Sequence, residues 1–480
     1  MEVDEQSYLL DLKGTKRNSG LSTVFAVICI LDVFGVFPVV TLPKTIINCG
    51  YYGLLAIPLL CCTQIYTAAL LGRCWVIAER ISPSIQRKSR YPYTALVEIS
   101  FGKKLGSWVS FLLDLTIFCG GIPNLIVASQ NLQLLGQRIS NGNVDISFCY
   151  WIIIVGSILC PISWYGSPKD MKFLCSLSAG IAISVFFLTC GCLLFSDVTR
   201  SNLEDDLLEE SHSWRALLKA YGIFAFQFDI HPSILTIQMD MFEKSQITRA
   251  LVGGFSVTFL MFGITTSIAF WKYGYDTKPS ILETLPTTVP LHIAAAFVAI
   301  QLCLTSTMSS SALFQQMEDC MSIRRDFNPK RCVLRFMLIV LAVVIAESVP
   351  NFDLVMSIVG GTLTGPLVFL LPPLIFMKMR SLQDDHEDQL TLMNFSNNVR
   401  GGDRRFTEQK FEDIQYQMPT NDFKMFFDKH LESKLCIFII LSSVLLTVST
   451  TYLNISSTAS FYTNVTKPCI YNVSLALLYL

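Results

Sequence analysis

The chain has 480 residues, of which 52% are hydrophobic and only 15% are charged, and its mean hydropathy is +0.49. This composition is typical of a membrane protein and excludes a single soluble core. The formal net charge is −1, and no polybasic tail is present. We therefore expect the lipid bilayer as a partner and no nucleic acid.

Hydropathy in windows of about 20 residues predicts eleven transmembrane helices. They begin near Leu21, Gly53, Ser107, Phe148, Lys172, Trp214, Arg249, Val289, Val333, Asp353 and Leu435. Residues 1–20 are polar and contain no cleavable signal peptide, so they form an N-terminal tail and the first span acts as the insertion signal. Residues 21–453 form the transmembrane domain. A polar, mobile loop at 378–434 separates helices ten and eleven, and residues 454–480 form a C-terminal tail.

The placement of basic residues predicts the orientation. With a cytosolic N-terminus, 27 of the 36 Lys and Arg residues fall in the inner segments, as the positive-inside rule requires. The loop between helices ten and eleven is then cytosolic, and the C-terminal tail faces the outside or a lumen. Three glycosylation sequons in that tail agree with this side: Asn454, Asn464 and Asn472.

The 16 cysteines are scattered through apolar runs, without CxxC pairs or histidine partners at metal-ligand spacing. We therefore interpret them as small buried hydrophobic residues and expect neither a metal site nor a cofactor. Only Cys49, Cys149 and Cys469 fall on the outer face, where one disulfide could form among them.

The sixth span, within 221–241, should be interrupted in the membrane. It places Gln227, Asp229 and His231 at mid-span, where polar side chains are costly unless they line a cavity. Pro232 follows them; it lacks a backbone N–H and disfavours helical geometry at the residue before it. We expect a break here, with half-helix ends of the kind that bind solutes in secondary transporters.

The first span has the same features. Asp32 lies at mid-membrane and is followed by Gly35 and Pro38, so this helix should also break. Interruptions at matching positions of two halves indicate an inverted repeat with a binding site between the halves. The alternative is that each proline merely kinks a packing helix.

Other intramembrane polar residues are less informative. Span three carries Asp114 in its inner third and small residues at its middle, which favour close helix packing over substrate contact. In span eight, Thr305 and Ser309 lie four residues apart on one face, where they could complete a cation site or bond back to their own helix. Glu347 lies near the outer end of span nine, where we expect it to be solvated.

Six stretches carry a family resemblance by their shared order. They are TLPKTIINCGYYGLL (41–55), LLGRCW (70–75), RYPYTALVEISFG (90–102), GSPKD (166–170), HPSILTIQMDM (231–241), and VPNFDLVMSIVGG through LLPP (349–373). Over most of its length the chain resembles the amino acid/auxin permease family, a branch of the amino acid, polyamine and organocation transporter superfamily. The resemblance implies an all-α polytopic membrane protein with eleven spans, a five-plus-five inverted repeat, broken helices one and six, and secondary transport of amino acids by proton or sodium symport.

The chain departs from the family pattern at both breaks. Span one has FGVFPVV at 34–40, where the family usually has small residues, and span six has QFDIHP at 227–232, where many members have a Gly-Gly pair before His-Pro. Backbone room for a substrate carboxylate is therefore reduced at span six, and an acidic residue is added.

These residues suggest a binding mode. The substrate carboxylate would face backbone amides near Gly35, and its ammonium group would face Asp229 or carbonyls near Phe226. The residues expected to contact the substrate are Gly35, Val36, Pro38, Phe226, Gln227, Asp229 and His231. The coupling proton would be carried by Asp229 or His231, with Asp32 as a further candidate.

The segment EQSYLL at 5–10 fits an acidic dileucine sorting signal, with Glu5, Leu9 and Leu10 as its determinants. It favours a lysosomal, endosomal or vacuolar membrane, and the plasma membrane is the alternative. A sensor that binds an amino acid without transporting it is a competing function. An enzyme is not expected, because the chain has only five histidines, no HExxH motif and no nucleophile with a matching base. A channel fits paired broken helices less well than alternating access does.

Overall fold

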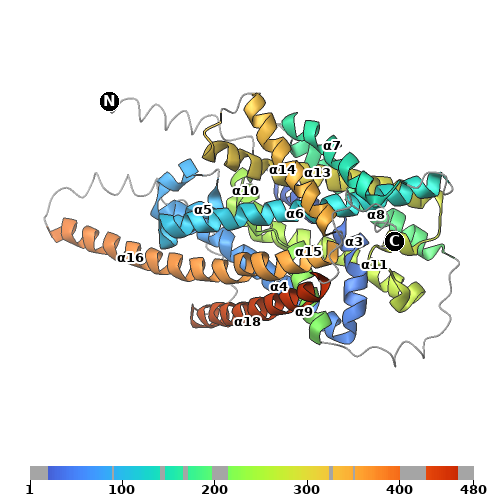
Figure 1. Cartoon of the computed structure of the whole chain (residues 1–480). Helices are drawn as coiled ribbons and strands as arrows, with labels where there is room; N and C mark the ends of the chain where they lie inside the picture. Colours follow the sequence, from blue (N-terminus) through green and yellow to red (C-terminus); the bar gives the residue numbers. More distant parts are fainter. Residues whose placement is uncertain are drawn as a thin grey trace.

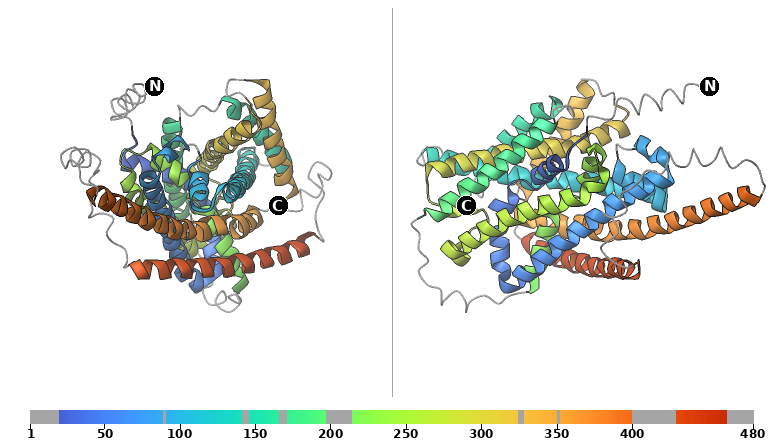
Figure 2. Two further views of the ribbon diagram at one scale, coloured as in Figure 1. Left: turned by 90° about the vertical axis from the view of Figure 1, so that its left-hand side faces the viewer. Right: turned by 180° about the vertical axis from the view of Figure 1, so that it is seen from behind.

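The computed structural model describes residues 20–88, 91–140, 146–165, 171–196, 214–323, 328–349, 352–399 and 429–462. Within these residues the protein is built from helices packed into one bundle (Figures 1 and 2). The sorting residues Glu5, Leu9 and Leu10, and the tail residues Asn464 and Asn472, lie outside the described residues.

The elements follow in this order. They are α2 (Thr23–Phe34), α3 (Phe37–Val40), α4 (Leu42–Ile81), η1 (Pro83–Lys88), α5 (Pro92–Phe101), α6 (Lys103–Ile139), α7 (Phe148–Tyr165), α8 (Met171–Leu194), α9 (Trp214–Gln227), α10 (His231–Asp240), η4 (Lys244–Gln246), α11 (Ile247–Tyr273), η5 (Gly274–Asp276), α12 (Ile281–Thr284), α13 (Val289–Cys320), α14 (Pro329–Ser348), α15 (Phe352–Val359), η6 (Gly360–Thr364), η7 (Pro366–Leu370), α16 (Leu371–Val399) and α18 (Lys429–Tyr462).

The described residues contain seven helices that are long and apolar enough to cross a membrane, and two shorter apolar helices, Thr23–Phe34 and Phe148–Trp164. The predicted all-α polytopic fold is therefore confirmed, while the count of eleven spans stays a prediction. Helix α4 includes a non-helical residue, Gly50 (φ 55°). The part of α4 before Gly50 continues the first span, and the part after it forms the second span.

Both predicted helix breaks are present. Helix α2 ends at Phe34, and Gly35 has φ 61° and ψ −146°, a conformation that a residue with a Cβ rarely adopts. Helix α9 ends at Gln227, and α10 begins at His231. In each case the chain resumes a helix within a few residues, so the backbone is interrupted only locally.

The packing partners of the helices follow the predicted inverted repeat. In such a repeat, each span of one half corresponds to the span five positions away in the other half. The contact of α2 (span one) with α11 (span seven) then corresponds to that of α9 (span six) with α4 (span two). The contact of α2 with α8 (span five) corresponds to that of α9 with the α15–η6 segment (span ten). Each of these pairs is in extensive contact. Helices α6 and α13, the third spans of the two halves, form the largest of the helix contacts.

Two contacts define the ends of the bundle. The Leu21 N–H donates to the Asp240 carbonyl at 2.7 Å, and the Phe242 N–H donates to the Leu21 carbonyl at 3.0 Å. The Lys44 Nζ donates to the Tyr275 carbonyl at 2.8 Å. We call the end with the two Leu21 hydrogen bonds the inner end, and the end with the Lys44 hydrogen bond the outer end. The start of the first span is thus joined to the end of the sixth at the inner end.

The tenth span is distorted. After α15 it forms two consecutive π-helical segments, η6 and η7, before α16 continues as an α-helix. A Cβ added at Gly360 in η6 would lie 1.8 Å from the Gly222 carbonyl oxygen of α9, so only a glycine fits there. Helix α16 extends past its neighbours α4 and α18 to Val399 (Figures 1 and 2). The prediction of a mobile loop was therefore wrong for residues 378–399.

The C-terminal helix α18 continues to Tyr462, beyond the predicted domain boundary at residue 453. Asn454 lies inside it and is only 6% exposed. Its Nδ2 donates to the Ser357 carbonyl at 2.9 Å, and the Ser357 Oγ donates to Asn454 Oδ1 at 3.1 Å. The prediction of Asn454 as a glycosylation acceptor is therefore wrong, because its amide is buried and already used.

The expected disulfide on the outer face and the expected solvation of Glu347 have different outcomes. Cys149 is disulfide-bonded, whereas the Cys49 thiol donates to the Ala216 carbonyl at 3.7 Å. Cys469, the third cysteine named above, lies outside the described residues. Glu347 is only 2% exposed, so the expectation that it is solvated was wrong.

Replacing Gly360 with alanine tests the close approach of α9 and η6. Because the new methyl group would collide with backbone, we expect a loss of about 3 kcal/mol, measured as a lower thermal unfolding midpoint of purified protein. Gly180→Ala in α8 is the matched control, since an added Cβ there meets nothing within 4 Å. Equal midpoints for the two variants would contradict the close approach.

Glycosidase treatment tests the burial of Asn454. Asn454→Gln should leave the glycosidase-sensitive shift in electrophoretic mobility unchanged, because the amide is held against Ser357. An Asn464→Gln, Asn472→Gln double variant serves as the comparison. A smaller shift caused by Asn454→Gln alone would show that Asn454 is accessible and glycosylated.

Candidate functional site

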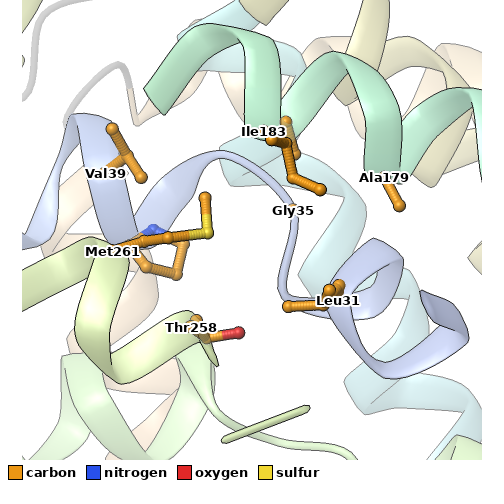
Figure 3. A pocket seen from close by; sticks show the side chains of 9 residues that line it. Leu31, Gly35, Val39, Ala179, Ile183, Thr258 and Met261 are labelled. Carbon is orange, nitrogen blue, oxygen red and sulfur yellow. The ribbon is translucent and has the colours of Figure 1, made fainter. Parts of the chain in front are cut away.

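The break in the first span borders a small pocket. The pocket lies between the break, α8 and α11. Figure 3 shows Gly35 of the break and Val39 of α3 around it, together with Thr258 and Met261 of α11. Its lining is almost entirely apolar; Thr258 supplies the one side-chain hydroxyl. The free volume is about 10 Å³, roughly room for one water molecule. In this conformation the break is therefore closed around almost no space.

The break in the sixth span is held by its own polar residues. The Asp229 Oδ1 accepts the backbone N–H of His231 at 3.1 Å and lies 3.5 Å from His231 Nδ1. The His231 Nε2 lies 3.0 Å from the Thr67 hydroxyl of α4. A carboxylate at a helix N-terminus is favoured by the helix dipole. Asp229 therefore caps α10, and His231, which is fully buried, joins α10 to α4.

One hydrogen bond joins the two breaks. The Gln227 Nε2 donates to the Phe34 carbonyl at 2.8 Å, which pairs a backbone oxygen at the end of α2. In α4, the Gln64 Nε2 donates to the Ala225 carbonyl at 3.1 Å and so pairs a carbonyl at the end of α9. Backbone groups freed by the breaks are thus satisfied by glutamine amides, as the membrane interior demands.

A buried polar network lies beside the first break. Asp32 is 3% exposed and lies close enough to Ser178 of α8 to interact with its side chain. The Gln301 Nε2 donates to the Ser178 hydroxyl at 3.3 Å and to the Thr305 hydroxyl at 2.7 Å. The network therefore joins α2, α8 and α13.

This network also touches the break itself. A Cβ added at Gly35 would lie 2.7 Å from the Gln301 Nε2, so the amide packs directly on the glycine. Two oxygens of the network, Asp32 Oδ1 and Gln301 Oε1, are buried without a hydrogen-bond partner among the described residues. Unpaired buried oxygens are acceptors that a proton, a water or a cation could satisfy. This arrangement could bind or transfer a small positive charge next to the break.

The structure separates some of the residues that the sequence grouped. Thr305 is buried in the network, whereas Ser309 is exposed and does not share its surroundings. The Phe226 ring lies 3.7 Å from the Cβ position of Gly120 in α6. Its carbonyl accepts the Asp229 N–H at 3.2 Å and is therefore already paired. Val36 is buried, and Pro38 lines the small pocket.

Sequence reasoning missed Gln301 and Ser178. Gln301 lies four residues before Thr305 on the same helical face, so its spacing could have revealed it. Ser178 carries no such signal, because only packing brings α8 against α2 and α13. Within the described residues, no group of three or more His, Cys, Asp or Glu side chains could hold a metal ion.

A helical membrane protein with two interrupted helices facing each other has an architecture typical of secondary transporters. A family model described as "Transmembrane amino acid transporter protein" matches residues 19–396. The chain therefore belongs to this transmembrane amino acid transporter family.

Two plant proteins of related sequence agree with that assignment. The chain is 23% identical over 396 residues to "Amino acid transporter AVT1I" of Arabidopsis thaliana, covering 79% of this chain and 90% of the relative. It is 24% identical over 306 residues to "Lysine histidine transporter-like 3" of the same plant, covering 60% of this chain and 67% of the relative. Among solved structures, it is similar to MhsT in complex with L-phenylalanine, with 12% identity, a TM-score of 0.49, and coverage of 78% of this chain and 99% of that one.

Removing the amide that joins the breaks should weaken the protein. Gln227→Ala leaves the Phe34 carbonyl buried without its donor, which costs about 1–3 kcal/mol and should lower the thermal unfolding midpoint. Gln383→Ala, which removes only a bond to Glu387 on α16, is the control and should change the midpoint little. If both variants unfold at the wild-type temperature, the Gln227 bond does not stabilise the breaks.

Proposed function

We propose that this protein is a secondary active transporter of amino acids that is driven by a proton gradient. Its family membership supports amino acids as the substrate class. The observation that carries the proposal is the polar network at the first break, because it joins an intramembrane carboxylate to the backbone at which a substrate would bind. Such intramembrane ionisable residues commonly serve proton relays.

The substrate would bind between the two breaks when the bundle opens. Its carboxylate would take backbone N–H groups near Gly35, and its ammonium group would face carbonyls near Phe226 or the Asp229 carboxylate. Gln227 would have to release the Phe34 carbonyl or remain as one wall of the site, because it now spans the gap. Val36, Pro38 and His231 would complete the surroundings on the two sides.

Asp32 is the coupling residue that the contacts favour. When it is charged, its buried Oδ1 lacks a donor among the described residues, so charging the closed form is costly. When it is protonated, the carboxyl group can donate a hydrogen bond within the network. Protonation would therefore favour close packing of α2 on α8, and proton loss would favour separation of α2.

Asp229 and His231 are the alternative coupling pair. Their polar atoms hold the start of α10 and its contact with Thr67, so proton loss or gain there would first alter that helix end. Sodium is the alternative coupling ion. It would use oxygens of the same network, with Thr305 as a ligand and Ser309 as a further one only if α13 moves.

We propose a cytosolic N-terminus and a lysosomal or endosomal membrane. The distribution of basic residues and the EQSYLL segment support this assignment. The outer end would then face an acidic lumen, with Asn464 and Asn472 available for glycosylation on that side. A proton gradient in that direction would drive amino acids into the cytosol.

A sensor without transport is the second candidate. The observation that favours it is the closure of the first break, where Gln301 covers Gly35 and the adjoining pocket has almost no free volume. A sensor would bind its ligand and change shape without completing a transport cycle.

Uptake into proteoliposomes separates these functions. Wild-type protein should accumulate labelled amino acids when an inward proton gradient is imposed. Asp32→Asn, which mimics the protonated acid, should lose this accumulation yet retain exchange of labelled for unlabelled substrate. Asp276→Asn, at an exposed residue of η5, is the matched control and should behave like the wild type.

Three results would contradict the proposal. Loss of proton-driven accumulation in Asp229→Asn but not in Asp32→Asn would assign coupling to the sixth span. Accumulation that follows only a sodium gradient would replace the coupling ion. Thermal stabilisation by an amino acid without accumulation or exchange would identify a sensor.

A further inference from the structure

A second cavity lies beside the α6–α13 contact. It opens between α6, α7, α13 and α14, and residues from all four helices line it, among them Phe118, Gly121, Leu159 and Phe314. Its free volume is about 60 Å³, against about 10 Å³ for the pocket at Gly35. Neither broken helix contributes a lining residue, so this cavity is separate from the proposed transport site.

Two hydroxyl groups face this otherwise apolar space. Ser306 and Ser310 lie one turn apart on α13, and both line the cavity. Within the described residues, neither hydroxyl has a hydrogen-bond partner. Serine hydroxyls in membrane helices usually bond back to their own helix, as Ser129 does to the Leu125 carbonyl at 2.8 Å. The two serines are therefore free to bind a polar group inside the cavity.

A carboxylate lies one helical turn beyond the cavity lining, on the same face of α6. Asp114 precedes the lining residues Phe118, Gly121 and Leu125 by four, seven and eleven positions, a spacing that puts all four on one face of α6. It lies about 6 Å towards the inner end from Phe118 along the helix axis. The side chain is partly buried and makes no ion pair with a described residue. An unpaired carboxylate at this depth is costly and needs a proton or a cation.

The arginine beside the lining ring of Phe314 is already paired. The Arg335 Nε donates to Glu318 Oε1 at 2.7 Å, and the Arg331 Nε donates to the same oxygen at 2.9 Å. The Arg335 guanidinium also lies 5.2 Å from the centre of the Phe314 ring, which lines the cavity. The positive charge beside Phe314 is therefore matched by Glu318, whereas Asp114 makes no ion pair with a described residue.

We infer that this cavity binds a hydrophobic primary amine. The ammonium group pairs with Asp114, its remaining N–H groups donate to Ser306 or Ser310, and the apolar body lies against Phe118 and Leu159. An alcohol of the same shape would lack the ion pair, and a carboxylate would be repelled by Asp114. The inference does not depend on the proposed transport activity.

Thermal unfolding of the purified full-length protein tests the site. The probe is 2-phenylethylamine, with 2-phenylethanol and phenylacetate as neutral and anionic probes of similar shape. We expect the amine to raise the unfolding midpoint by about 2 °C near saturation and the other two compounds to leave it unchanged. In Asp114→Asn the amine concentration needed for half of that shift should rise about tenfold or more.

Two further variants locate the binding. Gly121→Leu should abolish the shift by filling the cavity, because a Cβ there projects into open space. Gly180→Leu is its control, since a Cβ at Gly180 also meets nothing within 4 Å. Asp32→Asn should keep the full shift, because Asp32 belongs to the other site.

Any of four outcomes would overturn the inference. They are an absence of stabilisation by the amine in the wild type, an equal shift with the alcohol, a full shift in Asp114→Asn, and loss of the shift in Asp32→Asn with retention in Asp114→Asn. The last outcome would place the amine in the transport site.

Discussion

Backbone groups that are freed inside a membrane must find partners in the protein, because lipid offers none. Both interrupted helices depend on this constraint. Gln227 pairs the Phe34 carbonyl across the two breaks, and Gln64 pairs the Ala225 carbonyl from α4. Asp229 caps the helix that resumes at His231. The polar residues of the sixth span therefore stabilise the breaks in this conformation. Any role in binding a substrate has to use the same atoms.

The same constraint connects the first break to the bundle around it. Gln301 packs against Gly35 and joins Ser178 to Thr305, so α2, α8 and α13 share one set of hydrogen bonds beside Asp32. A single proton would therefore act on three helices at once. The chain's departure from its family pattern has a structural meaning here. Phe34 packs against Phe228 and Phe255 at the first break, and Gln227 of the sixth span pairs the Phe34 carbonyl.

Helix identity and helix breaks could be predicted because they depend on local chemistry. Gly35 adopts φ 61°, which is open to a residue without a Cβ, and Pro232 lies at the start of α10, where a missing N–H breaks no helical bond. The roles of the polar residues could not be read in the same way. Asn454 of α18 begins a sequon, yet its side chain is buried against Ser357. Glu347 lies near a helix end, yet it is only 2% exposed. Thr305 and Ser309 share a helical face but not an environment.

The sequence by itself determined the membrane class, the two interrupted helices and the family, because hydropathy, proline and glycine positions, and ordered motifs are properties of the chain. Only the tertiary structure decided which polar groups meet. Ser178 and Gln301 are 123 residues apart, and Ser306 and Ser310 line a cavity together with Phe118 because α13 packs on α6. Such pairings depend on how helices approach each other. Side-chain spacing within one helix shows which residues share a face, but not which helix will lie opposite that face.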